Sequence, residues 1–99
     1  MKLKGKVAVL TAAAGAGIGQ ATARILAREG ATVVITDIHL ERTLSVAQSI
    51  HDEYGIETIG IKCDVTQKNE IENVIKTAVD KFGRIDILFN NAGTNRPAA

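Results

Sequence analysis

The sequence has little of several features that mark specialised classes of protein. Among its 99 residues there is one cysteine, Cys63, so the chain can form neither an internal disulfide nor a multi-cysteine metal site. The 12 basic and 11 acidic side chains give a net charge of +1 and are spread along the chain, which argues against a nucleic-acid partner. No hydrophobic run is long enough to span a bilayer, so we expect no membrane partner. These absences indicate one small soluble domain, and the lone thiol favours a reducing, cytoplasmic environment.

The start of the chain imitates a secretory signal peptide. Lys2, Lys4 and Lys6 precede a short apolar segment at residues 7–14. The apolar segment is short, and the glycines that follow it have a different use, described below. We therefore interpret the segment as the first strand of a folded domain.

Hydrophobic periodicity alternates along the chain between two patterns. Runs rich in β-branched and apolar residues predict four strands, at residues 7–11, 32–36, 58–63 and 85–89. Three segments with helical periodicity separate them: the first starts at Ile18 and ends at Gly30, the second runs from Leu40 to Gly55, and the third follows Thr66 as N-cap and ends at Gly83. The apolar faces of these helices are expected to consist of Ile18, Ala21, Ile25 and Leu26, then Leu40, Leu44, Ala47, Ile50 and Tyr54, and then Ile71, Val74, Ile75, Ala78, Val79 and Phe82.

Strands separated by single helices require right-handed crossovers and a parallel sheet. We expect an α/β fold, a Rossmann-type doubly wound sheet limited to its first four strands in the order 3-2-1-4. The first and fourth strands would then flank the point where the connections diverge to opposite faces, and ligands bind in the crevice there.

A glycine-rich loop joins the first strand to the first helix. It reads Gly15–Ala16–Gly17–Ile18–Gly19. Glycines let the backbone turn sharply and approach a phosphate, and the helix N-terminus offers N–H groups and a positive dipole end. We expect Gly17 and Gly19 to receive a pyrophosphate, with Ile18 forming part of the wall beneath it. The alternative is a loop that is rich in glycine merely to turn the corner.

Asp37 lies at the end of the second predicted strand, 18 positions after Gly19. That is close to the spacing of about 20 expected for the acid that binds the adenosine ribose of a dinucleotide. A carboxylate there accepts hydrogen bonds from both ribose hydroxyls and repels a 2′-phosphate, so NAD is favoured over NADP. Arg42 is near enough to keep NADP open. Asp37 could instead be the N-terminal acid of the next helix.

These residues together resemble the short-chain dehydrogenase/reductase family. Residues 11–19, Thr-Ala-Ala-Ala-Gly-Ala-Gly-Ile-Gly, are similar to that family's Thr-Gly-x-x-x-Gly-x-Gly signature, with one extra residue after Thr11 and alanine at the first glycine position. Asn90–Asn91–Ala92–Gly93 matches the family's Asn-Asn-Ala-Gly turn after the fourth strand. Asp64–Val65 matches the acidic position after the third strand, which in relatives contacts the adenine. Asp64 could equally help Thr66 to cap the next helix.

The resemblance implies NAD-dependent hydride transfer between an alcohol and a ketone in a homo-oligomeric parent protein, with Asn90, Ala92 and Gly93 lining the crevice toward the nicotinamide. The family's catalytic serine, tyrosine and lysine lie downstream of that turn. The one tyrosine, Tyr54, lies on an apolar helix face without a Tyr-x-x-x-Lys partner, so we expect it to be packing. We therefore assign no catalytic residue and interpret residues 1–99 as a truncated NAD(P)-binding half-domain that is inactive alone.

Two other interpretations remain at this point. The spacing of Gly15, Gly17 and Gly19 also fits S-adenosylmethionine-dependent methyltransferases, although those loops usually carry an acid where this chain has Ala13. The chain could also be a stand-alone NAD-binding module without catalysis.

The fourth predicted strand, with Ile85, Ile87, Leu88 and Phe89, reads as a strand buried on both faces. Without a fifth strand its edge would be exposed, so we expect self-association through this edge. His39 and His51 have no metal-ligand spacing and are expected on helix surfaces, and Cys63 is expected in the core.

Overall fold

The computed structural model describes residues 2–11, 13–15 and 17–90. Its elements alternate as the periodicity predicts, and the four strands form one parallel sheet in the order β3-β2-β1-β4, which confirms the predicted fold class and topology. The elements are β1 (Val7–Thr11), α1 (Ile18–Arg28), β2 (Thr32–Asp37), α2 (Leu40–Tyr54), β3 (Thr58–Lys62), α3 (Lys68–Phe82) and β4 (Ile87–Asn90).

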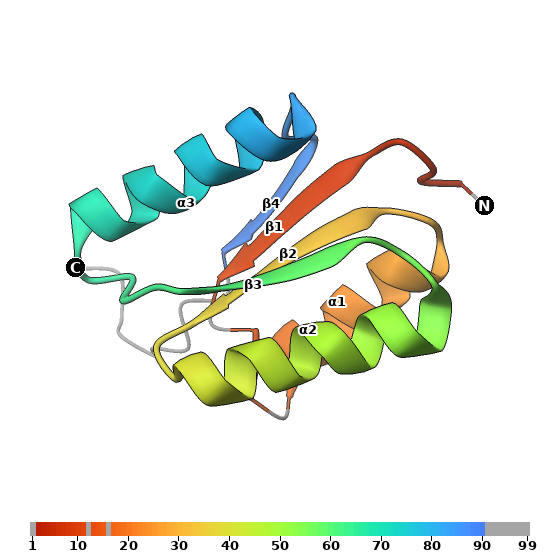
Figure 1. Ribbon diagram of the computed structural model, residues 1–99, viewed down its shortest axis with the longest axis horizontal. Helices are drawn as coiled ribbons and strands as arrows, with labels where there is room; N and C mark the ends of the chain where they lie inside the picture. The colour runs from red at the N-terminus through yellow and green to blue at the C-terminus, as the bar shows by residue number, and fades with distance from the viewer. Residues whose placement is uncertain (1, 12, 16, 91–99) are drawn as a thin grey trace.

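The sheet is the middle of three layers. Helices α1 and α2 cover one face and α3 covers the other (Figure 1). All five residues of β1 are buried because this strand lies between two neighbours and between both helical layers. Near-continuous apolar runs of this kind are typical of parallel strands with both faces covered.

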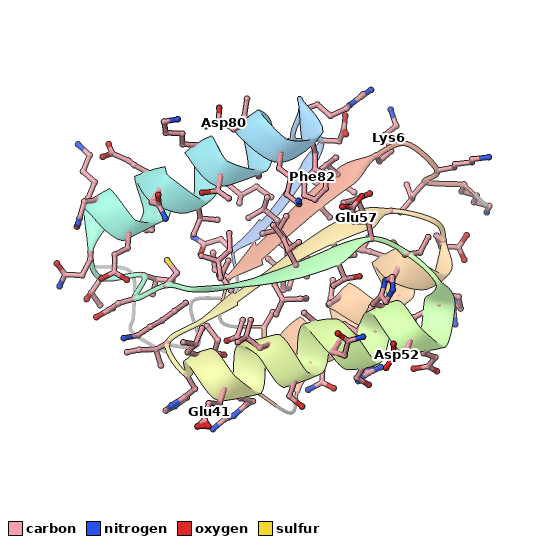
Figure 2. All side chains as sticks on the ribbon, viewed as in Figure 1. Lys6, Glu41, Asp52, Glu57, Asp80 and Phe82 are labelled. Atoms are coloured by element: carbon pink, nitrogen blue, oxygen red, sulfur yellow. The ribbon has the colours of Figure 1, made fainter. Side chains whose placement is uncertain are left out.

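Each face of the sheet has its own hydrophobic core. The core under α1 and α2 contains the fully buried Leu10, Ile35 and Ile50. The core under α3 is smaller and includes Val9 and Val34 from the strands. Figure 2 shows Phe82 turned toward the sheet from the end of α3, whereas Asp80 lies on the outer side of that helix.

Helix α1 does not pack as its apolar periodicity predicts. Its buried residues are Gly19, Ala23 and Ala27, one helical turn apart, whereas Ile18 and Ile25 are 72% and 51% exposed. Ala21 is exposed as well, and of the four predicted positions only Leu26 is partly buried against the core. The prediction was wrong because small residues let the helix backbone lie close to the sheet, which turns the larger side chains outward.

The other two helices bury most of the predicted positions, with three exceptions. Leu40 and Leu44 of α2 and Val79 of α3 are between 44% and 50% exposed, so their placement on the packed faces was wrong. In α2, Thr43 is fully buried instead. Its hydroxyl donates a 2.7 Å hydrogen bond to the His39 carbonyl, so the polar group is satisfied inside the core. A polar side chain satisfied within its own helix can therefore occupy a core position.

The turn before α3 differs from the predicted cap. The helix begins at Lys68 and its N-cap is Gln67, so the assignment of Thr66 as N-cap was wrong. The Thr66 amide and hydroxyl donate to the Asp64 carboxylate at 2.9 and 2.7 Å, which makes a local turn that ends before the helix starts. Glu70 in the first turn accepts a 2.8 Å bond from the Asp64 amide.

Strand β3 ends at Lys62, one residue before the predicted end, and β4 is shifted to residues 87–90 because its pairing with β1 begins at Ile87 opposite Ala8. Just before β4, the Asp86 carboxylate accepts a 2.9 Å bond from the Val7 amide and three bonds of 2.7–3.1 Å from the Arg84 guanidinium. This contact joins the beginning of the chain to its last described strand.

Candidate functional site

The carboxyl ends of all four strands lie at one edge of the sheet because the strands are parallel. The predicted site residues therefore converge: the glycine loop follows β1, Asp37 ends β2, Asp64 and Val65 follow β3, and Asn90 ends β4. A 2.8 Å bond from the Cys63 amide to the Asp37 carbonyl holds the segments after β2 and β3 side by side.

The N-terminus of α1 is open toward this edge. Its N-cap is Gly17, with φ +134° and ψ −158°, a backbone conformation that L side chains rarely adopt. No side chain caps the helix within the described residues, and the backbone bond from the Ala21 amide to the Gly17 carbonyl is the first of the helix. The amides of Ile18, Gly19 and Gln20 precede that bond and are available to a ligand.

The three helices differ in the charge at their N-termini. The first turns of α2 and α3 contain Glu41 and Glu70, and Figure 2 shows Glu41 at the start of α2. The first turn of α1 contains no acidic residue. The positive end of the α1 dipole is therefore left without a carboxylate of its own helix to neutralise it.

Asp37 lies between the glycine loop and α2. Its side chain is buried, one carboxylate oxygen accepts a 3.1 Å bond from the Ala14 amide, and the other accepts a 3.3 Å bond from the His39 amide. The predicted alternative, an acid serving the start of the next helix, is thus part of its role. A carboxylate has about four acceptor positions, so these two bonds leave capacity for a ligand.

Three basic side chains surround a shallow cavity next to Asp37. Its lining includes His39, Arg42 and Lys62, together with the acidic Glu41. Arg42 also reaches the glycine loop, since its guanidinium would lie 3.3 Å from a Cβ on Gly15. The sequence showed Arg42 only as a nearby cation; Lys62 was missed because its proximity depends on the pairing of β3 with β2.

Asp64 and Val65 are both half-buried at the same edge. Hydrogen bonds from the Thr66 side chain and backbone lower the pKa of the Asp64 carboxyl from its ordinary value. Burial raises the pKa of the neighbouring Cys63 thiol, and the Glu70 and Asp64 carboxylates raise it further. Cys63 is therefore a protonated core residue, as expected, and not a reactive thiolate.

Asn90 joins β4 to the central strand at the switch point. Thr11 is paired with Asn90 in the sheet, and its hydroxyl donates a 2.9 Å bond to the Asn90 side-chain oxygen. The other predicted residues of this turn, Ala92 and Gly93, lie outside the described residues.

The remaining candidates for chemistry have structural positions. Tyr54 is half-buried against the core under α1 and α2, as expected. His39 and His51 are exposed, and among the described residues no three His, Cys, Asp or Glu side chains are placed to hold a metal ion. None of the helices within residues 2–11, 13–15 and 17–90 combines the length and apolarity needed to cross a bilayer.

The family model described as short chain dehydrogenase matches residues 6–99. This chain belongs to the short-chain dehydrogenase family. It is 41% identical over 92 residues to the mitochondrial borneol dehydrogenase of Lavandula x intermedia, covering 93% of this chain and 33% of the relative. It is 46% identical over 92 residues to a hexahydroindene-carboxyl-CoA reductase of Mycobacterium tuberculosis, covering 92% of this chain and 35% of the relative. The chain thus spans about a third of the length of the curated relatives it matches.

Solved structures of short-chain dehydrogenases share the fold closely. NAD⁺-bound xylitol dehydrogenase is 39% identical with a TM-score of 0.88, over 95% of this chain and 35% of that one. L-sorbose reductase from Gluconobacter frateurii, complexed with NADPH and L-sorbose, is 34% identical with a TM-score of 0.89, over 100% of this chain and 38% of that one. The family assignment leaves the methyltransferase interpretation without support, and the two structures show that relatives hold either dinucleotide.

Proposed function

We propose that residues 1–99 are the cofactor-binding half-domain of an NAD-dependent oxidoreductase that interconverts an alcohol and a ketone by hydride transfer. One observation carries the proposal. The open N-terminus of α1 and the buried Asp37 carboxylate meet across the glycine loop, where the Ala14 amide donates to Asp37. An anion-binding helix end beside a hydroxyl-binding acid is the pairing that an adenosine ribose and its pyrophosphate require.

The residues present fit such a cofactor. Gly17 and Gly19 with the wall residue Ile18 would receive the pyrophosphate, and Gly15 would let the backbone pass close to it. Gly17 is exposed and has the positive φ that a side chain would strain, while Ile18 is exposed at 72% and free to contact a ligand. The unneutralised dipole of α1 favours the negative charge.

The adenosine end would lie along the edge from β2 to β3. Asp37 would accept hydrogen bonds from the ribose hydroxyls, and Asp64 with Val65 would border the adenine. The bond between Cys63 and Asp37 supports this, since it places the two segments next to each other. The negative charge of Asp37 favours NAD. Arg42 and Lys62 oppose this preference, because cations attract the 2′-phosphate of NADP.

The nicotinamide end would extend toward β4, where Asn90, Ala92 and Gly93 would line the crevice. The bound cofactor supplies the hydride chemistry, and these residues bind and orient it. We assign no catalytic residue within the chain and propose that it holds the cofactor without turnover by itself. The whole protein would act as a homo-oligomer in the cytoplasm, in keeping with the reduced, buried Cys63.

The test is direct titration of the chain with NADH and with NADPH. The emission of the reduced nicotinamide reports binding directly. Because the chain contains no tryptophan, no tryptophan emission contributes to the signal. NADH should bind more tightly than NADPH. Asp37→Asn should weaken NADH binding about tenfold, since the charged acceptor of two hydroxyls is lost. Arg42→Gln should weaken NADPH binding while NADH binding changes by less than about threefold.

Asp52→Asn is the matched control because Asp52 is an exposed acid on α2 that accepts a bond from Gln48. It should leave both affinities unchanged. Tighter binding of NADPH than of NADH would overturn the NAD preference alone. Failure of the wild-type chain to bind either dinucleotide would overturn the proposed function.

A further inference from the structure

The glycine loop is one residue longer than the family signature and has alanine at the first glycine position. A longer loop has more backbone freedom, so it needs contacts that hold it in one conformation. The described part of the loop is held from two sides. On one side, the Ala13 amide donates to the Thr36 carbonyl at 2.9 Å and the Ala14 amide donates to Asp37. On the other side lies Gln20, in the first turn of α1.

Gln20 holds two successive carbonyl groups of the loop. Its side-chain nitrogen lies 3.3 Å from the Ala14 oxygen and 3.1 Å from the Gly15 oxygen. A side-chain amide has two N–H donors, so one group can serve both acceptors. Gln20 therefore closes the loop onto its own helix.

The orientation of the Gln20 amide is fixed by a chain of contacts that continues to α2. Its oxygen accepts a 3.1 Å bond from Arg24, whose guanidinium also forms a 2.9 Å ion pair with Glu53 and a 3.2 Å hydrogen bond to Ser49. Because Arg24 can only donate, the Gln20 oxygen must face Arg24 and its nitrogen must face the loop.

We propose that Gln20 is a positioning residue for cofactor binding, which keeps the carbonyl dipoles of the loop turned away from the pyrophosphate. In a trans peptide the C=O and the following N–H point to opposite sides, and the described backbone contains no cis peptide. Binding the Ala14 carbonyl to Gln20 thus turns the Gly15 amide away from Gln20. A loop free to rotate could present carbonyl oxygens to the phosphates, which would repel them. The proposal rests on the proposed function, since it takes the loop to receive a pyrophosphate.

The test compares Gln20→Met with the matched control Gln48→Met, using NADH as the probe. Methionine has a similar length and no donor, and Gln48 is an exposed glutamine on α2 whose side chain bonds to Asp52. Gln20→Met should weaken NADH binding about tenfold, the loss equivalent to one or two net hydrogen bonds. Gln48→Met should leave the affinity unchanged. Gln20→Lys restores a donor but offers no acceptor to Arg24, so it should recover only part of the NADH affinity that Gln20→Met loses, a partial rescue that a merely structural role would not give.

A second variant and a readout without ligand make the test independent of folding defects. Gln20→Glu keeps the shape and the contact with Arg24 but has no N–H donor, so it should lose at least as much NADH affinity while melting near the wild-type temperature. Hydrogen exchange at the Ala14 and Gly15 amides should be faster in Gln20→Met than in Gln48→Met.

Two outcomes separate this inference from the proposed function. If the wild-type chain binds NADH and both donor-free variants bind it equally well, the role of Gln20 is overturned and the proposed function stands. If the wild-type chain binds neither NADH nor NADPH, the proposed function fails and the role of Gln20 in cofactor binding fails with it.

Discussion

The two edges of the sheet are built differently. Strand β3 is packed on both faces, since Gly60 lies against Thr43 of α2 while Ile59 and Ile61 are partly buried against the cluster under α3. Strand β4 exposes 58% of Leu88, and no strand of the described residues pairs with its outer side. An edge between two helical layers can end a sheet, whereas an apolar edge with one uncovered face is typical of a strand that has a further neighbour.

The largest expected effect is at the covered edge. A Cβ on Gly60 would lie 2.9 Å from the backbone oxygen of Thr43, so Gly60→Ala must push α2 away from β3. We expect a loss of about 1–3 kcal/mol of unfolding free energy, as for other overpacked cores. For a domain of this size the melting temperature should fall by about 4–8 °C per kcal/mol. Urea or thermal denaturation checks this, and an unchanged melting temperature would show that the edge is loosely packed.

At the exposed edge, we expect an effect on association more than on stability. Leu88 presents apolar surface beside unpaired backbone groups, so the isolated chain should self-associate through β4. Leu88→Lys should abolish this association and cost less than about 1 kcal/mol, because the side chain is already mostly exposed. Sedimentation velocity over a range of concentrations measures the association of the wild-type chain and of Leu88→Lys.

Leu44→Lys is the control for that experiment. Leu44 is 50% exposed on α2, so the substitution removes a similar apolar surface away from β4. It should leave the association intact. A wild-type chain that sediments as a monomer at every concentration would contradict the assignment of β4 as an association edge.

The smallest expected difference concerns stability in acid. It is the difference between Asp86, just before β4, and Asp64, just after β3. Hydrogen bonds from Arg84 and then from the Val7 amide lower the pKa of Asp86, and bonds from Thr66 lower that of Asp64. A carboxyl whose pKa is lower in the folded state stabilises the fold above its unfolded pKa of about 3.9, and that stability is lost as the pH falls through the folded value. Asp86→Asn should therefore have a lower melting temperature than wild type at pH 7. Its melting temperature should also fall less than that of wild type when the pH drops below about 4.

Asp64→Asn should show a weaker version of the same behaviour. The Thr66 partner of Asp64 is two residues away and can persist in part in the unfolded chain, whereas Val7 meets Asp86 only on folding. Melting curves from pH 7 to pH 3 distinguish the two variants. Equal pH profiles would show that the long-range bond of Asp86 adds nothing to the local one.

The sequence predicted the elements and topology well because strands and helices are encoded by local periodicity. Residues 7–11 form a strand at the predicted bounds, and Gly55 and Gly83 end their helices in the left-handed conformation expected of C-terminal glycines. The packed face of α1 was not predictable in the same way. Gly19, Ala23 and Ala27 have little hydrophobicity of their own, and their burial depends on how closely the helix approaches the sheet.

For the candidate site, motif spacing identified the residues at the strand ends but not the contacts between them. The position of Asp37 was predicted, while its bond to the Ala14 amide depends on how the loop folds back over β2. Gln20 gave no signal in the sequence, because a glutamine on a helix surface is ordinary. Its contacts with the loop and with Arg24 follow only from the three-dimensional course of residues 13–15.

The pairing of β1 with β4 has a consequence for synthesis of the chain. The central strand is made first, yet the partners that complete it, Asp86 for Val7 and Asn90 for Thr11, lie 79 residues later. At about 5–20 residues per second, a ribosome needs roughly 4–16 s to add those residues. During that interval the apolar residues of β1 lack the neighbour on one side. Among the four described strands, β1 therefore waits longest for its second neighbour, and a nascent chain paused before β4 would leave one side of β1 unpaired.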